Sequence, residues 1–171
     1  MIVPVPEVEP LIAAALGGSQ RSETGLPPHI TLLYPFVPGE AIDETIEVAV
    51  AELLAGCAPF EFRLARVASF PSVLYLEPQP ADGFLELTRK LRARWPELPP
   101  YRGEFAEVIP HLTVATGETD QSLVSALERQ LPFEATAEEV WLSVQERGGR
   151  WATHRRYRLG GDPSPVPMQR A

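Results

Sequence analysis

One short pattern occurs twice in the chain and constrains both its fold and its chemistry. It reads Pro28-His29-Ile30-Thr31-Leu32 near the start and Pro110-His111-Leu112-Thr113-Val114 in the second half. Alternate side chains of an extended strand face opposite sides. Each copy therefore predicts a strand with a histidine and a threonine on one face and aliphatic side chains on the core face. The repetition predicts a duplicated unit that carries half of a site in each copy.

Two such pairs, brought together, suit the cleavage of a phosphate ester. One proton must leave the attacking oxygen and another must reach the leaving oxygen, and histidine, with an ordinary pKa of about 6.5, can do either near neutral pH. Threonine hydroxyls can donate to the non-bridging phosphoryl oxygens. His29, Thr31, His111 and Thr113 are therefore candidate catalytic residues, and this chemistry needs no metal or other cofactor. The alternative is that the histidines are structural residues of half-buried strands, in which threonine is also common.

The double motif resembles that of the 2H phosphoesterase superfamily, which includes the 2′-5′ RNA ligase-like proteins and the cyclic nucleotide phosphodiesterases. The similarity covers residues 1–160 and is clearest in residues 26–36, 70–76 and 108–115. The resemblance implies an α+β fold in which two pseudo-symmetric lobes, with mainly antiparallel sheets, surround a central cleft and carry their helices on the outside. Some relatives have an arginine two residues before the second histidine. Ile109 stands there in this chain, so a phosphate contact from that position is not expected.

The resemblance also implies an activity. We expect a phosphoesterase that acts on a 2′,3′-cyclic phosphate or a 2′-5′ phosphodiester of RNA ends or small nucleotides. The reverse reaction would be 2′-5′ RNA ligation without ATP. A nucleotide- or RNA-binding module with little or no turnover is the alternative from another class of function.

The hydrophobic pattern predicts the elements around the two motifs. Strands are expected at 1–5, 29–34, 60–64, 73–76, 133–145 and 151–159, and helices at 7–16, 41–54, 84–95 and 121–131. Thr119 or Asp120 can cap the last helix. This order predicts one α+β domain over residues 1–160, with lobe-like halves at 1–80 and 81–160. The proline-rich tail, residues 161–171, is expected to be disordered.

Five further residues are candidates for substrate binding. Tyr34 is expected on the core-facing side of its strand, where its hydroxyl can reach the rim of the cleft, and Phe36 and Tyr75 could stack on a base. Because Arg155 and Arg156 are adjacent in a strand, only one of them can face the cleft and hold a phosphate. For all five, packing or solvent exposure is the alternative.

A metal site is a rival interpretation. His29, His111 and His154 together could bind zinc as a three-histidine site, although two His-x-Thr strands do not have typical metal-ligand spacing. ATP chemistry has little support, because the chain has a single lysine, Lys90, and no phosphate-binding glycine-rich loop.

Charge, hydropathy and cysteine content limit the binding partners and the cellular compartment that are expected for this chain. A net charge of −8 argues against binding of long duplex nucleic acid, so a small nucleotide or an RNA terminus is the expected substrate. The chain has no apolar run long enough for a membrane helix and no secretory signal, and its single cysteine, Cys57, fits a reducing compartment. A cytoplasmic monomer is therefore expected.

Overall fold

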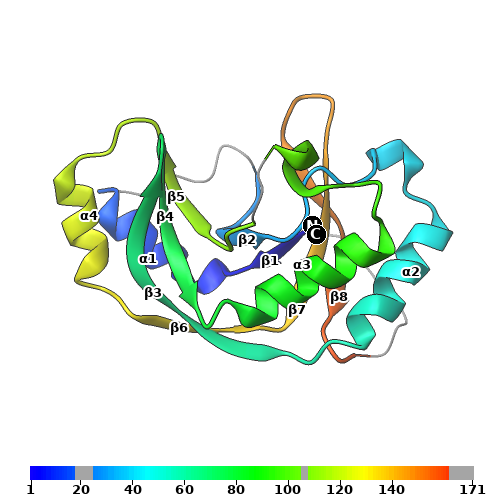
Figure 1. Cartoon of the computed structure of the whole chain (residues 1–171). Helices are drawn as coiled ribbons and strands as arrows, with labels where there is room; N and C mark the ends of the chain where they lie inside the picture. Colours follow the sequence, from blue (N-terminus) through cyan, green and yellow to red (C-terminus); the bar gives the residue numbers. More distant parts are fainter. Residues whose placement is uncertain (18–24, 105–107, 162–171) are drawn as a thin grey trace.

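The computed structural model describes residues 1–17, 25–104 and 108–161, in which strands and helices alternate as the sequence predicts (Figure 1). The strands are β1 (Ile2–Pro4), β2 (His29–Thr31), β3 (Phe60–Phe70), β4 (Val73–Gln79), β5 (Leu112–Thr116), β6 (Phe133–Ala137), β7 (Glu139–Gln145) and β8 (Trp151–Arg158). The helices are α1 (Glu9–Ala15), α2 (Glu44–Ala55), α3 (Asp82–Arg94) and α4 (Gln121–Glu128), and short 3₁₀ turns lie at Pro6–Val8, Gly39–Ala41 and Pro100–Gly103. The expected α+β class is confirmed.

The strands form one curled sheet in the order β6-β3-β4-β5-β2-β1-β7-β8, and every pair of neighbours is antiparallel. Only Glu138 separates β6 from β7 along the chain, yet β6 is one edge of the sheet and β7 lies next to the other edge. The sheet must therefore curl to bring these two ends together. Register shifts in the β3–β4, β4–β5 and β7–β8 pairs help it to bend.

The strand order divides into two similar halves, β6-β3-β4-β5 and β2-β1-β7-β8. Each half combines strands that precede residue 80 with strands that follow residue 110. The expected division of the sequence near residue 80 remains a prediction.

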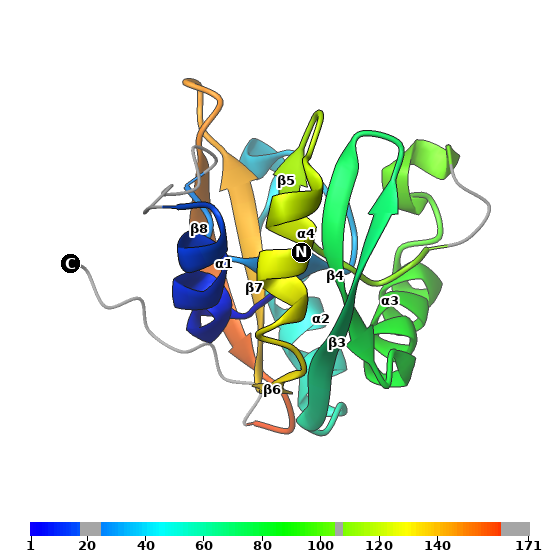
Figure 2. The ribbon, with the colours of Figure 1, turned by 90° about the vertical axis from the view of Figure 1, so that its left-hand side faces the viewer.

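The helices lie on the outside of the two halves. Helix α1 contacts α4, and α4 contacts β3, so these two helices cover one half, as the turned view shows (Figure 2). Helix α2 contacts β8 on the opposite side of the molecule. The side chains of Asp43 and Asp120 cap α2 and α4, each accepting a hydrogen bond of 3.0 Å from a backbone N–H of the first turn. Asp120 is one of the two caps that the sequence predicts.

The first motif strand is shorter than expected. A strand over 29–34 is predicted, but β2 ends at Thr31. The reason is that the N–H groups of Leu32 and Leu33 both donate to the carbonyl of Met1, at 3.0 and 3.3 Å, so the regular ladder cannot continue. The chain turns away at this point, and this turn decides where Tyr34 lies.

Aliphatic side chains from both motifs contribute to the core. Ile30 and Leu112 are fully buried, together with Leu32, Leu76 and Leu142. Helix α3 packs behind the first motif, where the buried Thr88 hydroxyl donates to the Leu32 carbonyl at 3.2 Å. No helix in the described part of the chain is both long and apolar enough to cross a membrane. The tail that is expected to be disordered lies outside the described residues, apart from Gly161.

Candidate active site

The two motifs lie side by side on neighbouring strands. Ile30 of β2 is the partner of Leu112 of β5 in an antiparallel pair. Extending this register by one residue in each direction places His29 opposite Thr113 and Thr31 opposite His111. Directly opposed side chains share a face at about 5 Å between their Cβ atoms. All four polar side chains therefore lie together on the face opposite Ile30 and Leu112, in an arrangement with an approximate twofold axis.

The two imidazoles have equivalent backbone partners. Nδ1 of His29 is 2.7 Å from the carbonyl oxygen of Pro27, and Nδ1 of His111 is 2.8 Å from that of Ile109, in each case two residues earlier in the chain. A carbonyl oxygen can only accept, so Nδ1–H is the donor in both. This fixes the tautomer of the neutral rings and leaves Nε2 of each ring to exchange a proton.

Burial lowers the pKa of His29 from its ordinary value of 6.5. The hydrogen bond to Pro27 opposes this effect, whereas the positive charges of the Met1 amino group and of His111 add to it. The electrostatic influence of His111 is consistent with two rings that lie close together. A histidine with a lowered pKa is neutral at pH 7 and can accept a proton.

Aromatic rings surround His111. Tyr75 of β4 lies opposite Thr113 of β5. Its ring stacks on that of Phe70, with ring centroids 4.3 Å apart and an interplanar angle of 25°. Both rings meet His111 edge to face, at 5.2 Å for Phe70 and 5.4 Å for Tyr75. Tyr75 thus adjoins the two motifs, as a candidate binding residue should. Phe70 is not predicted as a site residue, because the contact depends on the hairpin that pairs the ends of β3 and β4.

The side of the site around His29 contains a cavity of about 170 Å³, lined by Thr31, Tyr34, Ser143 and Trp151 as well as His29. Tyr34 is 45% exposed, and its ring meets that of Trp151 at 5.8 Å and 71°. It therefore lies at the rim, because the chain leaves the sheet after Thr31. The Ser143 hydroxyl is buried and has no hydrogen-bond partner among the described residues.

A residue that sequence reasoning missed contacts the first motif. The phenol of Tyr101 forms a hydrogen bond with the Thr31 side chain, and burial raises the pKa of this phenol. Its backbone N–H donates to the carbonyl of Tyr34. Tyr101 and Arg102 both have left-handed backbone angles, with φ of 49° and 56°, which are unfavourable for side chains of this size. In the sequence, Tyr101 is not part of a hydrophobic pattern with the period of a helix or a strand, so this pattern does not identify it.

Phe36 is not brought to the histidines. Its ring packs edge to face on Trp95 at 5.1 Å, and it lines an adjoining hollow of about 310 Å³ rather than the cavity that contains His29. The packing alternative fits this residue best.

The two adjacent arginines face opposite sides, as the alternation predicts. Arg155 forms an ion pair of 3.0 Å with Glu47 of α2, on the helix side of the sheet. Arg156 lies over the Trp141 ring at 4.2 Å. Opposed pairs connect Thr31 to Ile2, Ile2 to Trp141 and Trp141 to Arg156, so Arg156 is on the same face as the motifs. Three strand spacings of about 4.8 Å separate it from Thr31.

The third histidine lies elsewhere. Nε2 of His154 is 2.8 Å from Glu47 Oε1, on the side of α2, so it does not converge with His29 and His111. In residues 1–17, 25–104 and 108–161, no three histidine, cysteine or acidic side chains are grouped as ligands of one metal ion. The geometry does not fit the three-histidine zinc site.

The comparisons with known proteins agree with the motif geometry. The sequence model of the 2′-5′ RNA ligase superfamily matches residues 6–149. The chain belongs to this superfamily. A protein of Bacillus cereus strain B4264 named "Putative phosphoesterase" is 31% identical over 145 residues, which cover 79% of this chain and 80% of that protein. A similarly named protein of Geobacillus kaustophilus is 30% identical over 146 residues, with 80% of each covered.

Solved structures of the superfamily's fold match almost the whole chain. TT0787 of Thermus thermophilus has a TM-score of 0.65 at 22% identity, covering 94% of this chain and 97% of its own. E. coli LigT in complex with 3′-AMP has a TM-score of 0.58 at 20% identity, covering 94% and 95%. These similarities confirm a LigT-like fold.

Proposed function

We propose that the chain is a metal-independent phosphoesterase that opens a 2′,3′-cyclic phosphate, or cleaves a 2′-5′ phosphodiester, by acid–base catalysis between His29 and His111. The observation that carries the proposal is the inverted pairing of two His-x-Thr strands, with both Nδ1 atoms engaged by backbone carbonyls. This leaves two Nε2 atoms on one face for two proton transfers. The opposed halves of the curled sheet are then the two lobes of the site.

Hydrolysis needs one neutral and one protonated histidine. His29 is the more buried of the two, and its lowered pKa suits the base. Its Nε2 takes a proton from water as the water oxygen attacks phosphorus. The bond from phosphorus to one ribose oxygen breaks, and Nε2–H of His111 gives that oxygen a proton. A 5′-hydroxyl in place of water, attacking with the same two roles while the bond from phosphorus to the 3′-oxygen breaks, gives 2′-5′ ligation. The roles exchange in the reverse reaction, in which the 2′-5′ diester is cleaved and the cyclic phosphate forms again.

The threonine hydroxyls are placed to stabilise the phosphoryl group. Thr31 and Thr113 lie diagonally across the site, each opposite the histidine of the other strand. Each can donate to a non-bridging oxygen, on which negative charge accumulates in the transition state. No step requires a metal ion.

A nucleotide is the ligand that the surroundings favour. Tyr75 and Tyr34 offer aromatic surface on opposite sides of the four catalytic candidates, and Arg156 adds a cation on the same face. E. coli LigT, which shares the fold, has been crystallised with 3′-AMP, ATP and NADP⁺. These complexes support a nucleotide-sized ligand for this chain as well.

The test is turnover of 2′,3′-cyclic AMP and of a 2′-5′-linked diadenylate in excess EDTA. We expect turnover by the wild type and a loss of about 10²- to 10⁴-fold in kcat for His29→Ala and for His111→Ala. Thr31→Ala and Thr113→Ala should each cost about 10²- to 10³-fold. His154→Ala, which removes the imidazole on the α2 side, is the matched control and should retain kcat.

Three outcomes would contradict the proposal. Loss of activity in EDTA would indicate metal chemistry. Equal activity of the wild type and the His29 or His111 variant would remove these residues from the mechanism. Binding of 3′-AMP with no turnover of either substrate would favour the nucleotide-binding module.

A further inference from the structure

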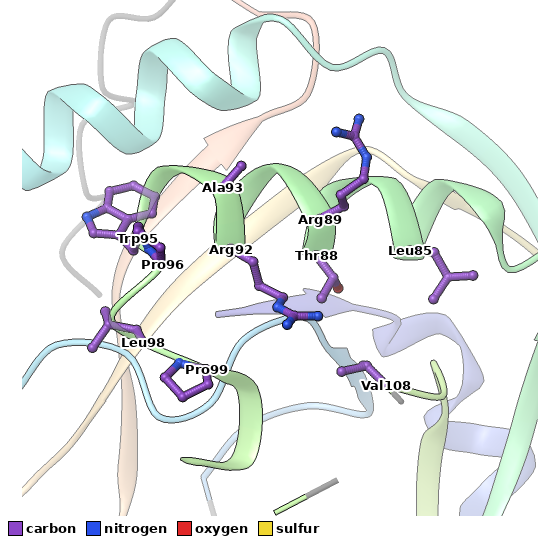
Figure 3. A pocket seen from close by; sticks show the side chains of 10 residues that line it. All are labelled: Leu85, Thr88, Arg89, Arg92, Ala93, Trp95, Pro96, Leu98, Pro99 and Val108. Carbon is purple, nitrogen blue, oxygen red and sulfur yellow. The ribbon is translucent and has the colours of Figure 1, made fainter. Parts of the chain in front are cut away.

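A groove separate from the two-histidine cavity lies between α3, residues 95–99 and Val108 (Figure 3). Its volume is about 610 Å³, which is within the usual range for sites that bind small organic molecules. Leu85, Leu98, Pro99 and Val108 give it apolar walls, and Leu85 is 42% exposed.

Two arginines of α3, Arg89 and Arg92, line this groove, and neither forms an ion pair with a carboxylate among the residues that the structure describes. Figure 3 shows Arg92 extending from α3 toward the side of the groove formed by Val108, whereas Arg89 turns away. Arg92 is exposed and has no ion pair with any residue that the structure describes. Lys90, on the same helix, is paired with Glu86 at 3.1 Å. On a chain of net charge −8, an unpaired cation beside an apolar wall favours an anionic ligand with an apolar body.

The groove borders both catalytic motifs. Val108 lines it, the next carbonyl, that of Ile109, holds Nδ1 of His111, and the Ile109 side chain is 48% exposed. The three residues from Val108 to His111 span at most about 11 Å. Across the groove, the Thr88 hydroxyl holds the carbonyl of Leu32, the residue after Thr31. The Val108 wall of the groove is therefore no more than about 11 Å from His111, which brings it within reach of the nucleotides that precede an RNA end bound at the histidines.

We propose that this groove binds the nucleotides that precede the reacting end of an RNA strand. Arg92 would hold a backbone phosphate, and a base would lie against Leu98, Pro99 or Val108. The inference rests on the proposed function, since the reacting end is the cyclic phosphate at His29 and His111. It assigns to the groove a preference for the end of an oligoribonucleotide over a free cyclic mononucleotide.

The experiment compares two substrates, 2′,3′-cyclic AMP and a tetraadenylate with a 2′,3′-cyclic phosphate end. The readout is the ratio of their kcat/KM values. We expect the wild type to prefer the tetranucleotide about tenfold or more, and Arg92→Gln to lose about three- to tenfold of this ratio. The log–log salt dependence of the tetranucleotide reaction should also become shallower by about 0.7. Arg129→Gln, which removes an exposed charge at the end of α4, is the matched control and should keep the wild-type ratio.

A wild-type ratio near one, or the same ratio in Arg92→Gln and Arg129→Gln, overturns the groove proposal. Turnover of the cyclic mononucleotide leaves the proposed function intact in that case. If neither substrate is turned over, the proposed function fails instead. Fluorescence anisotropy with a fluorescein-labelled tetraadenylate 3′-phosphate then decides about the groove: weaker binding to Arg92→Gln than to Arg129→Gln supports it, and equal binding overturns it.

Discussion

His29 and His111 have equivalent backbone partners, but His29 is the more buried of the two. This difference has a measurable consequence. Burial lowers the pKa of His29 from 6.5. His29 must be neutral to accept a proton, so the acid side of the pH profile of kcat/KM for 2′,3′-cyclic AMP should fall below pH 6.5, through this lowered pKa. A pH–rate profile checks this, together with an NMR titration in which His29→Asn identifies the His29 resonance. Titration of that resonance at or above pH 6.5 would contradict it.

Tyr101 should act through Thr31. The Tyr101→Phe variant keeps the ring but loses the hydrogen bond to the threonine hydroxyl. We expect kcat to fall about three- to tenfold, because the hydroxyl is less well oriented toward the phosphoryl group. The effect should disappear in a Thr31→Ala background, since the interacting partner is then absent. Independent, multiplicative losses in the double variant would show that Tyr101 does not work through Thr31.

At the scale of the elements, the helices and motif strands could be predicted because each has a local cause. Asp120 caps α4, and alternation places Ile30 and Leu112 in the core. The early end of β2 could not be predicted, since it depends on the carbonyl of Met1, far away in the sequence. Periodicity identifies the buried face of a strand but not its neighbour, so the contacts of Phe70 and Tyr101 with the motifs required the folded chain.

Helix α2 is held to β8 by one carboxylate. Glu47 is 2.8 Å from His154 and 3.0 Å from Arg155, and its side chain is 17% exposed. Glu47→Gln should lower the free energy of unfolding by about 1–3 kcal/mol, because it leaves the Arg155 charge without its partner in a half-buried place. Chemical denaturation measures this. Glu52→Gln, at an exposed position of the same helix, should change it by less than about 0.5 kcal/mol. Equal effects of the two variants would argue against the ion pairs.

At the scale of the whole molecule, the two halves of the sheet should unfold together. The continuous segment from β6 through Glu138 to β7 joins one half to the other, and each half combines strands that precede residue 80 with strands that follow residue 110. We expect one cooperative transition in which far-UV circular dichroism and tryptophan fluorescence coincide. Two separated transitions would show that the halves are independent units.

The strand order also bears on how such a chain could have arisen. The unit β1-α1-β2-α2-β3 is followed by a unit that begins in the same order, β4-α3-β5-α4, and continues with β6, β7 and β8; each unit contains one His-x-Thr pair. A strand after the second helix of each unit pairs with the first strand of the other unit, β3 with β4 and β7 with β1. A half-length chain that kept this pairing would place its last strand on the first strand of a second copy. The pair of histidines would then have met first between two chains, and duplication would have joined an existing interface into one polypeptide.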